Sequence, residues 1–230
     1  MSEWIYLSYS LSPTTPMYGN REGFKIEKTS QICCGDSANS SKYSFPNHIG
    51  THLDAPLHFS EHGASIDSYP ASYWIFNNPS LINIKVDNNQ LITAAMIEES
   101  IDSSPSPLQH NSDLLFLRTG FETVRTDIDY WKNNPGIAID VGPYLREKYP
   151  NVRLLGVDVI SISSFQNREV GREAHRALLD PDKKGSPIVL MEDVSLTPIC
   201  EKSIHQIIVS PLRVEGADGS PCTVLAHCNS

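Results

Sequence analysis

Short apolar runs separated by turns dominate the hydrophobic pattern of this chain. Alternating apolar residues are typical of half-buried β-strands, and continuous short runs are typical of strands covered on both faces. The runs predict strands at residues 5–11, 23–28, 81–86, 114–119, 152–158, 188–191, 207–212 and 222–226. Helical spacing predicts helices at residues 93–100, 141–149 and 164–179, with Thr93 and Ser164 as N-caps. Many strands with few helices indicate a mixed sheet architecture of the α/β class.

Residues 48–59 differ from the other runs because their polar side chains are of metal-ligating types. His48, His52, Asp54 and His58 all occupy even positions, and apolar residues lie between them. In an extended backbone, residues of one parity share a face, so these four groups would point in the same direction. A glycine and a proline within the stretch predict a short strand that runs into a loop.

Imidazole and carboxylate ligands suit Zn²⁺, Mn²⁺ or Fe²⁺. His48, His52 and Asp54 could hold one ion and leave a position open for water or substrate. Asp54 has two oxygens and could therefore bridge to a second ion. Spacing alone does not choose among the candidates for the remaining ligands, which are His175, Glu192, His62, His110 and Asp158. Residues 217–221 predict a tight turn, so Asp218 is assigned no role in the site.

Composition excludes several classes of protein. With 230 residues and 40% hydrophobic residues, the chain can bury a core without disulfides, and we expect a single domain over residues 1–230. A net charge of −9 without a cluster of basic residues argues against nucleic acid or an anionic membrane surface as a partner. Because the sequence shows neither a long apolar run nor a secretion signal, we expect a soluble, cytoplasmic protein.

The cysteines do not predict a second kind of site. They are odd in number and lack C-x-x-C spacing: Cys33, Cys34, Cys200, Cys222 and Cys228. In a cytosolic chain such cysteines are usually reduced packing residues. None lies close in sequence to a plausible general base, which disfavours a nucleophilic cysteine.

The spacing His48-x-Gly50-Thr51-His52-x-Asp54-x-Pro56-x-His58-Phe59 resembles the signature of the cyclase family, which includes bacterial kynurenine formamidase and isatin hydrolase. The resemblance continues in family order through residues 117–120, 156–158, 174–179, 187–192 and 217–221. It implies a swivelling β/β/α fold with a mixed sheet core, assembled as a homodimer or homotetramer. It also implies a small-molecule substrate and a site for one or two divalent ions.

By this resemblance, His48, His52 and Asp54 would hold the first ion, and Asp54, His175 and Glu192 would hold the second. Zn²⁺ is the expected ion and Mn²⁺ the alternative. The assignment of Glu192 rests on its place at the end of a strand, after a segment that is longer here than in the formamidases.

The resemblance also assigns roles to His58 and Tyr18. His58 would be the proton-transfer residue, a task suited to a side chain with an unperturbed pKa near ~6.5. Formamidases have a tryptophan in the proline-rich loop that contacts the aromatic substrate, and this chain offers Tyr18 in that loop. We therefore expect Tyr18 to contact the substrate. Residues 180–186 form an insertion relative to the formamidases.

The implied activity is hydrolysis of a carbon–nitrogen bond other than a peptide bond, by water that a divalent metal activates. An aryl formamide such as N-formylkynurenine would be the substrate. One alternative is ring opening of a cyclic amide or lactone, as in isatin hydrolase. Another is a metal-containing binding protein of the same fold without turnover. The presence of His58 beside the three ligands favours an enzyme, because a purely binding site has no need of that group.

Overall fold

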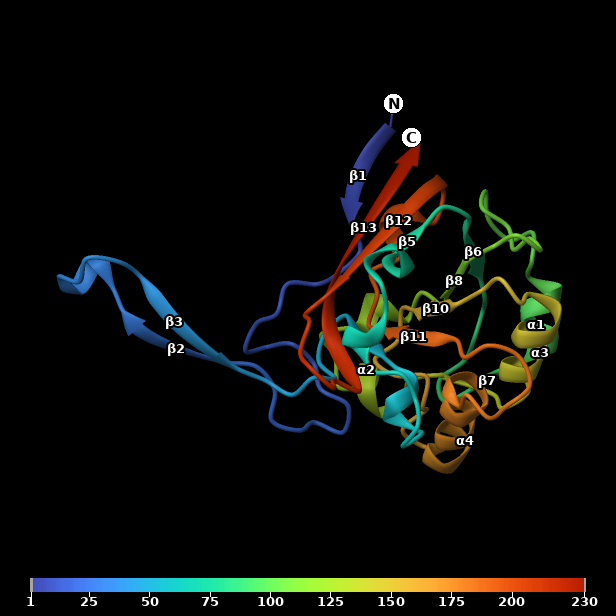
Figure 1. The fold of residues 1–230 in the computed structure, drawn as a ribbon, viewed down its shortest axis with the longest axis horizontal. Coiled ribbons are helices and arrows are strands. Elements are labelled where there is room, and N and C mark those ends of the chain that lie inside the picture. Colours follow the sequence, from blue (N-terminus) through green and yellow to red (C-terminus); the bar gives the residue numbers. More distant parts are fainter. Residues whose placement is uncertain (1, 230) are drawn as a thin grey trace.

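The computed structural model describes residues 2–229, and its main feature is a large mixed sheet of nine strands (Figure 1). The strands are β1 (Ser2–Tyr6), β4 (His52–Asp54), β5 (Ile75–Phe76), β6 (Pro79–Asn83), β8 (Leu114–Arg118), β10 (Leu154–Val157), β11 (Val189–Glu192), β12 (Ser203–Pro211) and β13 (Gly219–Asn229). Their order is β5, β12, β13, β4, β11, β10, β8 and β6, with β1 also paired to β13. Strands β6, β8, β10 and β11 form a parallel group. Strand β4 is antiparallel to both β11 and β13, and it therefore joins this group to the antiparallel strands.

Four α-helices lie among the described residues: α1 (Ala94–Glu99), α2 (Asp129–Lys132), α3 (Val141–Lys148) and α4 (Arg168–Leu179). Two further pairs of strands stand apart from the large sheet. They are β2 (Lys25–Ser30) with β3 (Ser40–Ser44), and β7 (Leu91–Ile92) with β9 (Gly136–Ile137). No helix among these residues is both long and apolar enough to cross a bilayer.

The apolar side chains of the central strands divide between two hydrophobic clusters. On β8, Leu114 and Phe116 pack into the cluster that includes residues of β12 and β13, whereas Leu115 and Leu117 pack into the cluster that includes α3 and α4. A strand buried on both faces needs apolar residues at every position, which explains the continuous run in the sequence. The resulting layers are antiparallel strands, parallel strands and helices, and the predicted mixed α/β fold with few helices is confirmed.

The predicted helix boundaries were accurate at Thr93 and wrong at Ser164. The Thr93 hydroxyl accepts the backbone N–H of Met96 at 3.3 Å, as expected of an N-cap. Helix α4, in contrast, begins only at Arg168. The backbone N–H of Asn167 donates to the carbonyl of Ser164 at 3.0 Å, so the residues after Ser164 form a turn before the helix starts.

A hairpin of β2 and β3 projects from the body of the molecule (Figure 1). Nearly all of its residues are exposed, so they show no alternation of buried and exposed positions, and the sequence did not predict β3. Cys33 and Cys34 are exposed at the tip of the hairpin. The expectation that every cysteine packs in the interior is therefore wrong for these two.

Candidate metal centre

The candidate site begins at β4, where the two parts of the large sheet meet. His52 and Asp54 point to one side of this strand, and Leu53 points to the other side into the core. On the neighbouring strand β11, Glu192 lies directly opposite His52. The Thr51 hydroxyl donates to the backbone carbonyl of Asp193 at 2.6 Å, which ties the start of β4 to the end of β11. The register of two strands therefore places His52, Asp54 and Glu192 side by side.

Two further histidines reach Asp54 from outside the strand. His48 precedes Gly50, whose φ of 59° lies in the left-handed region that favours glycine, and the turn there returns His48 toward Asp54. His58 lies in the short 3-10 helix Pro56–His58 that follows β4. The expected shared face exists only where the backbone is extended, at His52 and Asp54, and His48 and His58 lie outside this short strand. They converge on the site through turns.

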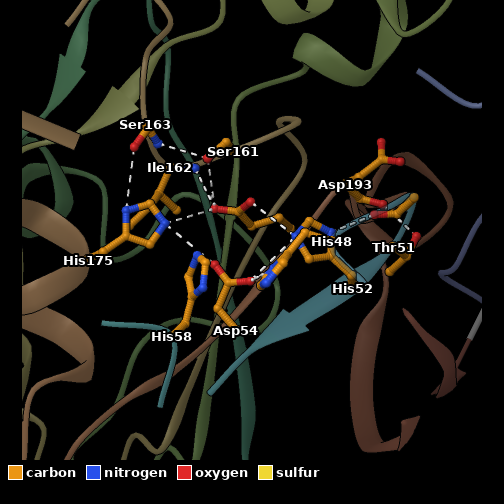
Figure 2. Close-up of polar contacts among 12 residues, drawn as sticks. His48, Thr51, His52, Asp54, His58, Ser161, Ile162, Ser163, His175 and Asp193 are labelled. Atoms are coloured by element: carbon orange, nitrogen blue, oxygen red, sulfur yellow. Dashed lines mark hydrogen bonds and ion pairs between the residues drawn. The ribbon is translucent and has the colours of Figure 1, made fainter. Parts of the chain in front are cut away.

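His175 approaches from helix α4, on the opposite side of Asp54 from His48 and His52 (Figure 2). His52, Asp54, His175 and Glu192 are each only 1–4% exposed. Glu192 is also held in place by its neighbours, because its Oε1 accepts the backbone N–H of Ile162 at 2.7 Å. Two buried carboxylates and two buried imidazoles therefore face one another.

The tautomers of His52 and His175 determine whether the Nε2 atoms, which face the carboxylates, can bind a cation. Each Nδ1 lies next to a backbone carbonyl, that of Gly50 at 2.8 Å and that of Gly171 at 2.7 Å. A carbonyl can only accept, so each Nδ1 donates its proton and each neutral ring presents an Nε2 lone pair to the carboxylates. Lone pairs facing carboxylate oxygens repel unless a proton or a cation lies between them.

The distances fit a cation. The Nε2 of His52 lies 3.5 Å from Asp54 and 3.4 Å from Glu192, and the Nε2 of His175 lies 3.5 Å and 3.6 Å from the same two carboxylates. Two ligands at about 2.1 Å from one tetrahedral ion are themselves about 3.4 Å apart. Each carboxylate turns one oxygen toward His52 and the other toward His175. The donor set therefore suits one or two divalent ions.

Asp218 is a site residue that sequence reasoning missed. Its Oδ2 lies 2.8 Å from Nδ1 of His58 and 3.0 Å from Nε2 of His48. The expected turn at residues 217–221 is wrong in its second half, because β13 begins at Gly219 and pairs there with Asp54. At Gly219, the residue after Asp218, a Cβ would come within 2.3 Å of the His48 ring. Only glycine permits this approach of His48 to β13.

The carboxylates change the acidity of the histidines. Burial lowers the pKa of His48, but Asp54 and Asp218 outweigh burial and raise it to about 9. Burial likewise lowers the pKa of His175, and Asp54 and Glu192 raise it to about 10. The pKa of Asp54 lies well below its usual range, because its hydrogen bonds to His175 and His48 outweigh the effect of burial. Without a metal, His48 and His175 are thus both in the charged imidazolium form at neutral pH.

These pKa shifts predict that metal binding releases protons. Below about pH 9, an ion must displace a proton from His48 and from His175, so its apparent affinity should rise with pH by about tenfold per pH unit for each proton displaced. Calorimetric titration of metal-free protein with Zn²⁺, in buffers of different ionisation enthalpy, measures the number of protons released. Binding of Zn²⁺ with no proton release between pH 6.5 and pH 8.5 would contradict this prediction.

All seven predicted site residues line one cavity of about 450 Å³: Tyr18, His48, His52, Asp54, His58, His175 and Glu192. Their individual roles stay predictions.

The other candidates that spacing left open have different surroundings. His62 lines another cavity, His110 stacks against Tyr149, and Asp158 accepts hydrogen bonds from Thr119 and Gly120. The structure thus brings His175 and Glu192 to Asp54 and leaves these three apart.

Comparison with known proteins decides the family. Residues 5–164 match the family described as "Putative cyclase". The chain belongs to the cyclase family. A kynurenine formamidase from Bacillus cereus is 30% identical over 220 residues, which cover 96% of this chain and 95% of the relative. Cyclase-like protein 3 from Oryza sativa subsp. japonica is 30% identical over 197 residues, which cover 81% of this chain and 65% of that protein.

Solved structures of two hydrolases share the fold. Isatin hydrolase A from Labrenzia aggregata superposes with a TM-score of 0.80 at 21% identity, covering 100% of this chain and 94% of the other. A "predicted metal-dependent hydrolase" from Bacillus stearothermophilus superposes with a TM-score of 0.75 at 22% identity, covering 99% and 98%. The likeness extends over the whole chain, so the strands that carry the candidate site belong to the shared fold.

Proposed function

We propose that this protein is a divalent-metal-dependent hydrolase that cleaves a carbon–nitrogen bond other than a peptide bond, with an aryl formamide as substrate. The observation that carries the proposal is the convergence of Nε2 of His52 and Nε2 of His175 on the carboxylates of Asp54 and Glu192, at 3.4–3.6 Å. The kynurenine formamidase relatives support the choice of an amide substrate. Zn²⁺ is the proposed ion and Mn²⁺ the alternative, because both accept imidazole and carboxylate ligands. A homo-oligomeric assembly and a cytoplasmic location stay predictions.

The proposed metal ligands are His48, His52, Asp54, His175 and Glu192. A divalent ion bound there supplies Lewis acidity, which acidifies water and polarises a carbonyl oxygen. The chain itself contributes burial, since four of these five side chains are almost fully enclosed. Low exposure strengthens the electrostatic interactions within the site and limits the entry of bulk water.

His58 is placed to move the proton that hydrolysis requires. Asp218 accepts a hydrogen bond from its Nδ1, which leaves Nε2 without that proton and able to act as the base. In the overall reaction, a water oxygen adds to the formyl carbon, the carbon–nitrogen bond breaks, and His58 passes a proton to the leaving nitrogen. The products are formate and an arylamine.

A substrate panel tests the proposed function. Protein loaded with Zn²⁺ or Mn²⁺ should hydrolyse formanilide and N-formylkynurenine with higher kcat/KM than isatin or a simple lactone. Highest activity on isatin or the lactone would replace the formamide by a cyclic substrate. Binding of these compounds to the metal-loaded protein without any turnover would contradict an enzymatic function.

A further inference from the structure

Asp193 directly follows the proposed ligand Glu192 and has an unusual backbone conformation. Its φ of 54° lies in the left-handed region, which is uncommon for residues other than glycine. Asn20 and Asn89 are the other non-glycine residues with positive φ among residues 2–229, and neither is buried, whereas Asp193 is only 1% exposed. Such a conformation persists in the interior only where the surrounding structure holds it, and residues of this kind gather at functional sites.

Arg125 and Tyr130 bind the carboxylate of Asp193. Arg125 donates through Nε at 2.7 Å and through a terminal nitrogen at 2.6 Å, and the Tyr130 hydroxyl donates at 2.5 Å. Paired, charge-assisted hydrogen bonds fix the orientation of the two groups as well as their distance. None of these three residues lines the cavity of the candidate metal centre. Their contacts therefore anchor Asp193 without offering the cavity a ligand.

The backbone of Asp193 is tied to the start of β4 through Thr51. The Thr51 hydroxyl donates to the carbonyl of Asp193 at 2.6 Å and accepts the backbone N–H of Tyr9 at 3.1 Å. The ring of Tyr9 packs against Arg125, whose guanidinium carbon lies 3.8 Å from the ring centroid. Asp193, Arg125, Tyr9 and Thr51 thus form a closed ring of contacts. Together with Tyr130 we call them the Asp193 network.

Two proposed metal ligands are sequence neighbours of the Asp193 network. Glu192 precedes Asp193, His52 follows Thr51, and the two ligands lie opposite each other on β11 and β4. In Figure 2, Asp193 and Thr51 lie on the opposite side of the site from His175. Nε2 of His52 and Oε2 of Glu192 are 3.4 Å apart. Because a metal site tolerates displacements of only about 0.5 Å, the backbone contacts of these two neighbours can decide whether the ligands fit an ion.

We propose that Asp193 is a positioning residue of the metal centre, whose bonds to Arg125 and Tyr130 hold the left-handed turn that sets Glu192 opposite His52. Asparagine also tolerates a positive φ, so the backbone conformation alone does not require an aspartate here. The charge of Arg125 does. This inference rests on the proposed function, because it takes His52 and Glu192 as ligands.

The metal affinity of Asp193→Asn tests this inference. The variant keeps the shape of the side chain and the tolerance of positive φ, and it loses the charge that Arg125 binds. The dissociation constant of Zn²⁺, measured by competition with a chelator, should rise by about 10- to 100-fold, the range for residues that orient metal ligands. With formanilide, kcat should fall and KM should change little, because the ligand geometry acts on the chemical step.

Co²⁺ gives a readout that a loss of stability alone would not change. The visible absorption spectrum of Co²⁺ bound in the site depends on the number and arrangement of its ligands. The spectrum of Asp193→Asn should therefore differ from that of wild-type protein when both are saturated with Co²⁺. This measurement does not depend on turnover.

Two further variants separate positioning from a general effect on folding. Tyr130→Phe deletes only the hydroxyl that donates to Asp193, and it should shift the Zn²⁺ affinity and the Co²⁺ spectrum in the same direction by a smaller amount. Arg153→Gln is the matched control, because Arg153 also pairs with an aspartate, Asp113, and lines a different cavity. It should keep the wild-type affinity and spectrum.

The outcomes distinguish this inference from the proposed function. Wild-type affinity and spectrum in folded Asp193→Asn would overturn the positioning role and leave the hydrolase intact, and Tyr130→Phe decides in the same way if Asp193→Asn does not fold. An equal loss of affinity in Arg153→Gln would also overturn it, since the effect would then follow stability. If wild-type protein binds neither Zn²⁺ nor Co²⁺, the proposed function fails and the inference fails with it.

Discussion

Asp54→Asn should abolish tight metal binding and lower kcat by about 10³-fold or more, because several kcal/mol of transition-state stabilisation depend on the metal. Asp54 serves both sides of the site. Its Oδ1 lies 2.7 Å from His48 and 3.5 Å from His52, and its Oδ2 lies 3.5 Å from His175. An amide keeps the shape of the carboxylate but offers one acceptor oxygen and no charge. Elemental analysis and steady-state kinetics on the same preparation measure both effects.

A control variant must show that this loss is specific to the site. Asp102→Asn makes the same chemical change at an exposed residue outside the cavity and should leave metal content and kcat at wild-type values. Circular dichroism of Asp54→Asn should show a folded protein. Wild-type metal content in Asp54→Asn would mean that the ion does not need the Asp54 carboxylate, and it would contradict the proposed set of ligands.

His58→Ala should lower kcat by about 10²- to 10⁴-fold, the range for loss of a general acid–base group. Metal content should stay at the wild-type level, because the proposed ligands are all retained. His62→Ala is the matched control, since His62 is exposed, lies four residues further along the chain and lines a different cavity. Loss of metal together with activity in His58→Ala would instead identify His58 as a ligand, and its proximity to His48 and Asp54 makes this a real test.

Asp218→Asn extends the test of His58. Asp218 holds Nδ1 of His58 at 2.8 Å, so its loss should let the ring turn or change tautomer and should lower kcat by about 10- to 100-fold. In the double variant with His58→Ala, the change at Asp218 should add little, because the ring that it positions is gone. Fully additive losses would place the main role of Asp218 at His48, which it also contacts.

The sequence predicted those parts of the fold that depend on local pattern. Continuous apolar runs marked the buried strands, and Leu114–Arg118 was correct almost to the residue. The hairpin strand Ser40–Ser44 was missed, since its exposed residues carry no pattern of burial. The start of helix α4 was wrong because Ser164 begins a separate turn, and within that turn the backbone N–H of Phe165 donates to Asn134, which lies far away in the chain.

The sequence likewise predicted only those parts of the candidate site that depend on local pattern. The alternation around Leu53 correctly placed His52 and Asp54 on one face of a strand. Spacing could not select His175 or Glu192, which reach Asp54 through the packing of α4 and the register of β11, and only the family resemblance named them. Neither residue spacing nor the family resemblance identified Asp218 as a site residue, because its neighbours in sequence are typical of a turn and its partners lie about 160–170 residues away.

Removal and replacement of the metal is the most direct test of the central claim. After treatment with a chelator, the protein should hydrolyse formanilide at least about 100-fold more slowly, as expected when Lewis-acid stabilisation is lost. Addition of Zn²⁺ or Mn²⁺ should restore the rate in wild-type protein and leave Asp54→Asn inactive. Undiminished hydrolysis by protein shown by elemental analysis to be free of metal would contradict the account.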